Sequence, residues 1–312
     1  MANAPFPIRN DLTAIALAYR NPKYVADLVL PRAGVAKQEF EYLAHTKADG
    51  YTIPATIVGR KGRPNEVEFS ASRSTSQTLD YGLEAPVPQA DIENAAPNYN
   101  PLAVHTELTT ELILLDREKR VADLVFAAAT YPAGNKTTLS GTSQWSDRTN
   151  SDPVNAILTA LDVPLIRPNV MVIGRAAWTQ LRQHPKLTAA AMPMGGNASV
   201  AGYASKEAVA DLFELDEIVV GEGFYNTAKP GQTASFSRLW GKHCALLYRN
   251  PQTMPTMGVT FGMTCQWGQR IAGTWEDRNI GLRGGQRIRV GESVKELITA
   301  SDVGYFFENA VA

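Results

Sequence analysis

The sequence predicts an α+β protein in which long strand pairs and one long helix flank a compact α/β unit. Residues 50–81 and 255–300 alternate apolar and polar side chains with a period of two, which is typical of half-buried strands. Between them, no Gly or Pro occurs from 102 to 130, which predicts a single long helix. Residues 151–254 alternate helical and strand-like patterns and predict the α/β unit.

Composition excludes several functional classes for this chain of 312 residues. Its 30 Lys and Arg balance 31 Asp and Glu, so the overall charge gives no long-range attraction to nucleic acid. Only two cysteines occur, which argues against a disulfide framework or a thiolate metal site and favours a reducing cytosol. The apolar run from Leu12 to Tyr19 is too short to span a bilayer, so no membrane partner is expected.

Two short apolar runs open the chain. The first predicts a helix capped by Asp11 that stops at Asn21 and Pro22, and the second covers residues 23–30 and ends at Pro31. Neither is long enough to be a stable helix in isolation. We therefore expect an N-terminal arm that lies on another surface, with a neighbouring copy as the supplier of that surface.

Residues 50–81 predict a two-stranded ribbon with one apolar face and a basic tip. Its face carries apolar side chains at alternating positions, namely Tyr51, Ile53, Ala55, Ile57, Val67, Phe69 and Ala71. Its tip carries Arg60, Lys61 and Arg63. A ribbon of two strands is marginally stable unless its apolar face is covered, and the Pro- and Asn-rich residues 84–101 predict a connector that supplies no cover.

The long helix is expected to begin with Asn100 as N-cap and Pro101 in its first turn, and to run for about 30 residues. Asp116 and Arg120 are spaced for an i,i+4 ion pair on its wet side. Its predicted apolar stripe consists of Leu108, Leu112, Leu115, Leu124, Val125 and Ala128.

A search for catalytic and binding motifs is negative. His243 and Cys244 are neighbours on a predicted strand, so their side chains leave on opposite faces. The four histidines form no metal-binding pair, and the glycine clusters lack the spacing of a nucleotide loop. The remaining enzymatic alternative is that residues 151–250 form an enzyme domain with appended hairpins.

The order of these parts resembles the Hong Kong 97-like major capsid proteins of tailed bacteriophages. The quoted stretches that carry the resemblance span residues 64–95, 108–126, 170–187, 212–226, 239–251 and 284–311. Among them are "LTTELILLDREKRVADLVF" for a spine helix and "VMVIGRAAWTQLRQHPKL" for an axial domain. The resemblance implies six parts: an N-terminal arm (1–45), an extended E-loop (46–95), a P-domain spine helix (96–150), an A-domain (151–254), a P-domain long hairpin (255–300) and a C-terminal strand returning to the A-domain (301–312).

What the resemblance implies is a structural shell subunit without enzymatic activity, cofactor or metal. Hexamers and pentamers of it would build an icosahedral virion capsid around double-stranded DNA, which the chain contacts without sequence specificity. Assembly in the host bacterial cytoplasm is expected, with a separate scaffolding protein and a portal as partners and a decoration protein as an optional one. An encapsulin-type compartment shares the fold and stays an alternative.

The resemblance also assigns contacts between subunits. The expected contacts are the E-loop tip (Arg60, Lys61 and Arg63), the E-loop apolar face (Ile53, Ile57, Val67 and Phe69) and the N-terminal arm (Leu12, Ile15 and Tyr24). Some family members form an isopeptide bond from an E-loop lysine to an asparagine. No motif here identifies such an asparagine, so Lys61 is interpreted as an exposed tip residue. Because the ribbon begins within about 50 residues of Met1, a long cleaved N-terminal segment is not expected.

Overall fold

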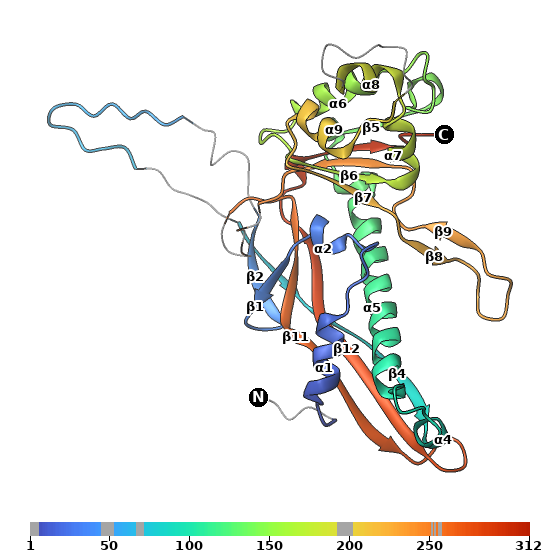
Figure 1. Ribbon diagram of the computed structural model, residues 1–312. Coiled ribbons are helices and arrows are strands. Elements are labelled where there is room, and N and C mark those ends of the chain that lie inside the picture. The colour runs from blue at the N-terminus through green and yellow to red at the C-terminus, as the bar shows by residue number, and fades with distance from the viewer. Residues whose placement is uncertain are drawn as a thin grey trace.

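The structure is a computed structural model that describes residues 6–44, 53–66, 72–191, 202–250, 252, 254 and 258–312. The described chain is elongated, with a five-stranded sheet and its helices at one end and a long four-stranded sheet at the other (Figure 1). A single long helix runs beside the four-stranded sheet and reaches the five-stranded one (Figure 1). Two extended segments project from opposite sides of this body (Figure 1).

The four-stranded sheet has the strand order β1-β11-β12-β4. Its strands are β1 (Arg32–Val35), β11 (Gly262–Asp277), β12 (Gly285–Ile298) and β4 (Leu79–Pro88). The β11–β12 pair is the long hairpin that the second alternating stretch predicts. Its turn is closed by Gly281 and Gly284, whose φ angles of 59° and 71° suit glycine far better than other residues.

The predicted ribbon over residues 50–81 is wrong as a single unit. Strand β3 (Ser72–Gln77) pairs with β2 (Glu39–Ala44), and β4 pairs with β12. Residues 53–66 contain no strand; a turn at 59–62 is closed by the Gly62 amide, which donates to the Gly59 carbonyl over 2.8 Å. Of the predicted apolar face, Val67 and Phe69 lie outside the described residues.

Residues 84–88, predicted as connector, are strand, and the short helix α4 (Gln89–Glu93) follows them. The prolines at 86 and 88 are compatible with the sheet because β4 is an edge strand, where one side of the backbone needs no partner strand. The local sequence pattern therefore predicts a shorter strand than the one that β4 contributes to the four-stranded sheet.

The long helix α5 (Pro101–Val125) begins as predicted. The Asn100 side chain accepts from the amides of Leu102 and Ala103 over 3.1 and 3.3 Å. The helix ends at Val125, earlier than expected, and a 3-10 turn, η1 (Ala128–Thr130), follows.

The predicted leucine stripe of α5 is only partly its buried face. Leu108 and Leu112 are 58% and 54% exposed. The buried face instead carries mostly polar and small residues: Thr106, Thr109, Thr110, Ile113, Arg117, Glu118, Val121, Ala122 and Val125. Threonine is tolerated there because its hydroxyl bonds to the carbonyl one turn earlier, as from Thr110 to Thr106 over 2.7 Å.

The five-stranded sheet has the order β5-β13-β10-β6-β7. Its strands are β5 (Lys136–Thr138), β13 (Gly304–Glu308), β10 (Cys244–Leu247), β6 (Val170–Gly174) and β7 (Glu217–Gly221). The helices of this end are α6 (Pro153–Leu161), α7 (Arg175–Leu181), α8 (Pro185–Ala191) and α9 (Lys206–Phe213). Two short 3-10 turns, η2 (Ala133–Asn135) and η3 (Gly141–Ser143), precede them, and η4 (Ser301–Val303) leads into β13.

One predicted strand of the α/β unit is divided in two. The pattern over 216–226 predicts one strand, but β7 stops at Gly221, and β8 (Phe224–Asn226) pairs with β9 (Phe236–Arg238) in a separate small hairpin. The indole of Trp240 lies against Gly221, where an added Cβ would be 2.1 Å from Trp240 Cγ. Only glycine admits this close packing.

The N-terminal segment forms α1 (Asn10–Ala18) and α2 (Ala26–Val29). Asp11 does not cap α1 as predicted; it lies in the first turn and pairs with Arg9. Leu12 and Ala16 are buried in one cluster with Ile113 of α5 and Ala272 of β11. The expectation that only a neighbouring copy supplies the bed of the arm is therefore wrong, because the chain's own helix and sheet supply it.

Candidate assembly surfaces and a buried polar junction

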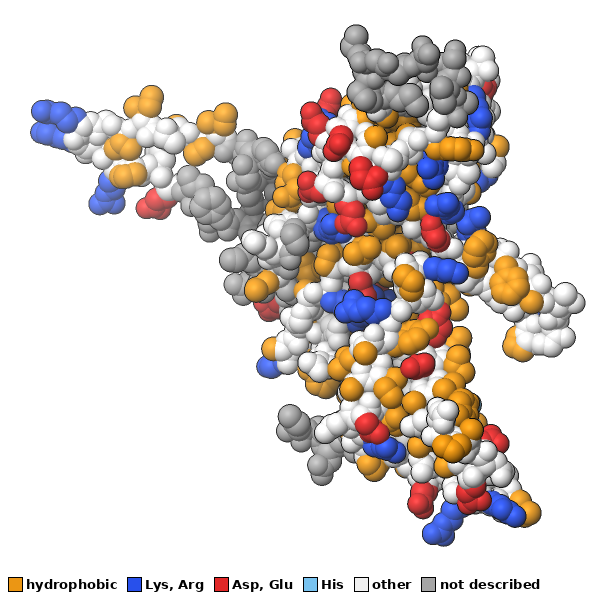
Figure 2. All heavy atoms as spheres, viewed as in Figure 1, with side chains coloured by type: hydrophobic (Ala, Val, Ile, Leu, Met, Phe, Trp, Pro, Cys, Tyr) orange, Lys and Arg blue, Asp and Glu red, His pale blue; other side chains and the backbone are white. Residues whose placement is uncertain are grey.

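The segment 53–66 carries the predicted apolar and basic residues outside the body. Ile53 and Ile57 are 94% and 93% exposed, and Arg60, Lys61 and Arg63 are exposed at and near the turn. Figure 2 shows basic side chains at the far end of this projection and hydrophobic ones along it. Exposure of large apolar side chains on a projection is typical of a segment that binds another molecule.

The three arm residues predicted to contact a neighbour lie on the chain's own body. Leu12 is 1% exposed, so practically no surface of it remains for a partner, and this assignment needs correction. Ile15 packs beside the same cluster as Leu12. Tyr24 donates its hydroxyl to Glu111 Oε1 over 2.7 Å, and burial together with this carboxylate raises the pKa of the phenol. Whether Ile15 and Tyr24 also contact a second copy stays a prediction.

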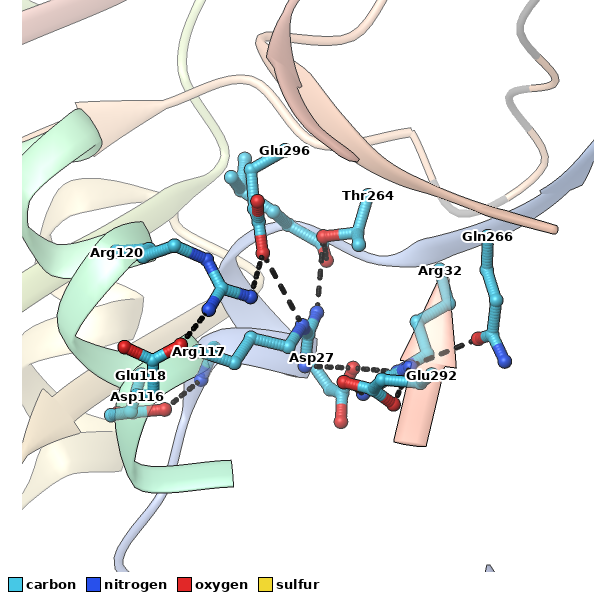
Figure 3. Close-up of polar contacts among 12 residues, drawn as sticks. Asp27, Arg32, Asp116, Arg117, Glu118, Arg120, Thr264, Gln266, Glu292 and Glu296 are labelled. Carbon is cyan, nitrogen blue, oxygen red and sulfur yellow. Dashed lines mark hydrogen bonds and ion pairs between the residues drawn. The ribbon is translucent and has the colours of Figure 1, made fainter. Parts of the chain in front are cut away.

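A network of buried and partly exposed ion pairs joins the arm, α5 and the β11–β12 hairpin (Figure 3). At its centre Arg117, 1% exposed, donates to Asp27 Oδ1 over 2.7 Å and to Thr264 Oγ1 over 3.0 Å. Arg32 also donates to Asp27 Oδ1, over 2.8 Å. Burial alone raises the pKa of Asp27, but Arg117 and Arg32 together hold it below its ordinary value.

The second half of the network centres on Glu292 of β12. Arg32 Nη1 and Arg270 Nη2 each donate to Glu292 Oε2 over 2.9 Å. Arg270 also donates to the Ala16 carbonyl at the end of α1 over 2.8 Å. The two arginines outweigh the effect of burial and keep the pKa of Glu292 below its ordinary value. The arm is thus held to the long hairpin by ion pairs that have little exposure to solvent.

Glu118 forms a separate junction one residue further along α5. Its Oε1 accepts from the Val25 amide over 2.9 Å and from Trp240 Nε1 over 2.6 Å, and its Oε2 accepts from the Ala26 amide over 2.8 Å. Burial raises the pKa of this carboxyl despite the three donors. The Glu118 side chain on α5 therefore binds both the start of α2 and Trp240, which packs against β7.

A cavity of about 530 Å³ lies beside these groups, between the arm, α5 and the β11–β12 hairpin. Its polar lining includes Asn21, Arg32, Arg117, Gln266 and Glu292. Asn21 donates to Glu111 Oε1 over 2.7 Å, Gln266 accepts from Arg32 over 2.9 Å, and the other three are engaged in the contacts above. None of the five is a nucleophile next to a base. Among the described residues, no three His, Cys, Asp or Glu side chains are placed to hold a metal ion.

One serine–histidine pair was missed by sequence reasoning. Ser151 Oγ lies 3.0 Å from His184 Nε2, and both residues are buried. The Lys186 amide donates to His184 Nδ1 over 3.3 Å, so Nε2 carries the proton and donates to the serine. Ser151 in turn donates to the Asp147 carbonyl over 2.6 Å. Burial lowers the pKa of His184, and the pair fastens the start of α6 to the start of α8 rather than activating a nucleophile.

No helix in the described part of the chain is long and apolar enough to cross a membrane.

The described His243 and Cys244 side chains do separate as predicted. Cys244 is buried in the core, and His243 Nδ1 accepts from the Asn309 amide over 3.0 Å.

Solved structures show which fold this arrangement has. A phage-related protein from Bordetella bronchiseptica RB50 superposes with a TM-score of 0.76 at 23% identity, covering 98% of both chains. The capsid of the cyanophage P-SCSP1u gives 0.58 at 10% identity, covering 93% of this chain and 89% of its own. The SrpI encapsulin of Synechococcus elongatus PCC 7942 gives 0.54 at 9% identity, covering 97% and 96%. The architecture is therefore a mixed helix-and-sheet shell fold, which phage capsids and an encapsulin share.

Sequence relatives are more specific than the fold. No protein-family profile matches the chain. A major capsid protein of Pseudomonas phage JBD67 is 56% identical over all 312 residues and is covered over 100% of its own length. A major capsid protein of Burkholderia phage BcepMu is 30% identical over 305 residues, 94% of each chain.

The chain belongs to the family of phage major capsid proteins, as its resemblance to the Hong Kong 97-like members predicted. It is a structural protein of the virion capsid, and it acts as part of an oligomeric assembly. The relatives decide between the two shell types that share the fold, in favour of the phage capsid over the encapsulin.

Proposed function

We propose that the chain builds hexamers and pentamers of an icosahedral shell that encloses phage double-stranded DNA. In this proposal α5 is the spine helix of the P-domain, the β11–β12 hairpin is its long hairpin, and the five-stranded sheet is the core of the A-domain. Because β4 pairs with β12, we place the end of the E-loop near Thr78 rather than at residue 95. The other domain boundaries are kept as the sequence suggests them.

One observation carries the proposal: the segment 53–66 presents Ile53 and Ile57 almost fully to solvent, away from the body (Figure 1). Burying an isoleucine side chain contributes about 1.5–3 kcal/mol, so two of them contribute roughly 3–6 kcal/mol per contact before ordering costs. Repeated around a capsomer, such moderate contacts stabilise a shell while misplaced subunits can still leave. Val67 and Phe69 would extend the same contact.

The remaining partners are proposed from the family. A separate scaffolding protein and a portal would act with the chain in the host bacterial cytoplasm, with a decoration protein as an optional third partner. Contact with packaged DNA would be non-specific, consistent with a net charge of −1 that neither attracts DNA at long range nor makes copies repel one another strongly.

The test compares Ile53→Ser/Ile57→Ser with the matched control Ile53→Val/Ile57→Val. Both substitutions lie in an exposed segment, so circular dichroism should report wild-type folding for each. Electron microscopy should show closed shells for wild type and the valine control, and unassembled subunits for the serine variant. A wild-type chain that stays a monodisperse monomer at high concentration with scaffolding protein present would overturn the proposal, and so would shells of the serine variant at wild-type yield.

A further inference from the structure

The small β8–β9 hairpin has an outward face that its own chain leaves uncovered. Its register pairs Phe224 with Arg238 and Asn226 with Phe236. Directly paired residues share a face of a strand pair, and so do residues two apart, so these four side chains lie on one side. Phe224 and Phe236 are 50% and 69% exposed there.

The opposite face of the hairpin is attached to the body. Tyr225 packs against the core cluster that contains Trp240, and Lys119 Nζ of α5 lies 5.3 Å from its ring centre. At the base, the Leu239 amide donates to the Gly223 carbonyl over 2.9 Å. The aromatic face therefore points away from the molecule by construction.

The hairpin is also preorganised. The Asn226 side chain accepts from the amides of Ala228 and Ser235, each over 3.0 Å, and the Thr227 amide donates to the Ser235 carbonyl over 2.7 Å. On the outward face the guanidinium of Arg238 lies 4.6 Å from the Phe224 ring centre, where it extends the flat aromatic surface. Aromatic residues and arginine on a rigid element are the composition of interface anchors, because little side-chain freedom is lost on binding.

The position of the hairpin indicates its partner. It projects from the side of the molecule opposite to the segment 53–66, and both projections carry hydrophobic side chains (Figures 1 and 2). In a ring of copies in head-to-tail contact, one side of each copy faces the opposite side of the next. A projection carrying Ile53 and Ile57 then reaches the side from which the neighbour's hairpin extends.

We propose that the Phe224 and Phe236 face of the β8–β9 hairpin is a second intersubunit arm, and that it binds the 53–66 segment of a second copy of this chain. The inference rests on the proposed function, which requires that this segment contacts a neighbour, and adds the surface that receives it. The apolar residues Ile53 and Ile57 precede the basic tip along the chain, so they can lie on the aromatic face while Arg60 and its neighbours pass beyond Arg238. Head-to-tail use of both projections would make every copy donor and acceptor at once.

The test uses the two projections in one chain. The natural Cys244 and Cys265 are buried, and burial raises the pKa of both thiols, that of Cys265 to about 12, so added cysteines are the reactive ones. Ile57→Cys/Phe236→Cys keeps Ile53 and Phe224 on the two surfaces, so it should still assemble. The assembled protein, mildly oxidised, should give a covalent ladder from dimer upward on non-reducing gels. In the control Ile57→Cys/Leu165→Cys, the second cysteine stands at an exposed position of the α/β unit instead of on the hairpin. This variant should stay monomeric on the same gel.

Assembly yield gives a second measurement. Phe224→Ser/Phe236→Ser should lower the yield of shells at least tenfold, whereas Phe224→Tyr/Phe236→Tyr, which keeps the aromatic rings, should stay within twofold of wild type. Shells of the serine variant at wild-type yield, or shells of the double-cysteine variant without a ladder, overturn this inference but leave the proposed function intact. Failure of the wild type to form shells overturns the proposed function itself.

Discussion

Removing the Glu118 carboxylate should destabilise the fold more than any exposed change on the same helix. Glu118→Ala leaves three buried donors without an acceptor: the Val25 and Ala26 amides and the Trp240 indole nitrogen. An unsatisfied buried donor costs about 1–3 kcal/mol. Because the three share one carboxylate, their losses are not additive, and we expect a loss of about 4 kcal/mol.

For a chain of this length, about 4 kcal/mol corresponds to a melting temperature lowered by roughly 6 °C. The assay is thermal unfolding of the unassembled subunit by circular dichroism. Glu107→Ala, at an exposed position of α5, is the matched control and should stay within about 0.5 kcal/mol of wild type. If both variants melt within about 1 °C of each other, Glu118 does not hold the junction as described.

The pH dependence of the same site has a defined sign. Burial raises the pKa of Glu118, so the folded state binds this proton more firmly than the unfolded chain. Its contribution to stability is complete below the ordinary glutamate pKa and is lost as pH rises through the raised value. Relative to Glu118→Gln, wild type should lose stability between about pH 4 and about pH 7. Urea midpoints at the two pH values measure this, and a relative gain would refute the reasoning.

Three other predictions concern the ion-pair network around Arg117 and the glycine that packs against Trp240. Arg117→Met should lower the free energy of unfolding by about 1.5–3 kcal/mol, because the charged hydrogen bond to Asp27 and the pairing with Glu296 are lost while Arg32 and Arg120 still pair with these carboxylates; urea denaturation would contradict this with a loss below about 0.5 kcal/mol. The pKa of Asp27 is held low by its arginines, so its stabilisation is present above the ordinary carboxyl pKa and is lost as pH falls through the lower, folded value. Asp27→Asn should accordingly flatten the fall of the urea midpoint below about pH 4, and an unchanged slope would speak against the pairing. Gly221→Ala forces a Cβ against the Trp240 ring and should cost about 1–3 kcal/mol, whereas Gly134→Ala, with open space around it, should change the melting temperature little.

Local signals in the sequence were sufficient for elements whose cause is local. The cap at Asn100 and the proline after it mark the start of α5, because they satisfy amides and set the backbone of the first turn. Alternation over 262–298 identifies the long hairpin for the same reason: the side-chain period belongs to each strand itself. Exposure of Ile53 and Ile57 was also predicted, from the absence of nearby sequence that could cover them.

Partner choice was beyond such signals. A period of two says that residues 72–77 form a strand, but not that they pair with 39–44 instead of 51–57, since either pairing satisfies the same backbone groups. Charged residues on a helix are ordinarily solvated, so Arg117 and Glu118 gave no sign that they are buried. Their partners Asp27 and Trp240 lie far away in the chain and are brought next to them only by the tertiary structure.

By itself, the amino-acid sequence determined the kinds of elements, their order and the presence of segments whose apolar side chains need a covering surface. The tertiary structure alone decided where those segments rest: the arm lies on its own α5 and β11, while the 53–66 segment and the β8–β9 hairpin extend from opposite sides. The physical reason is that secondary structure follows from torsions and periodicity within a few residues. Burial, by contrast, depends on which distant surfaces come into contact. The free energy of such a contact comes from pairs of residues that are far apart in the sequence.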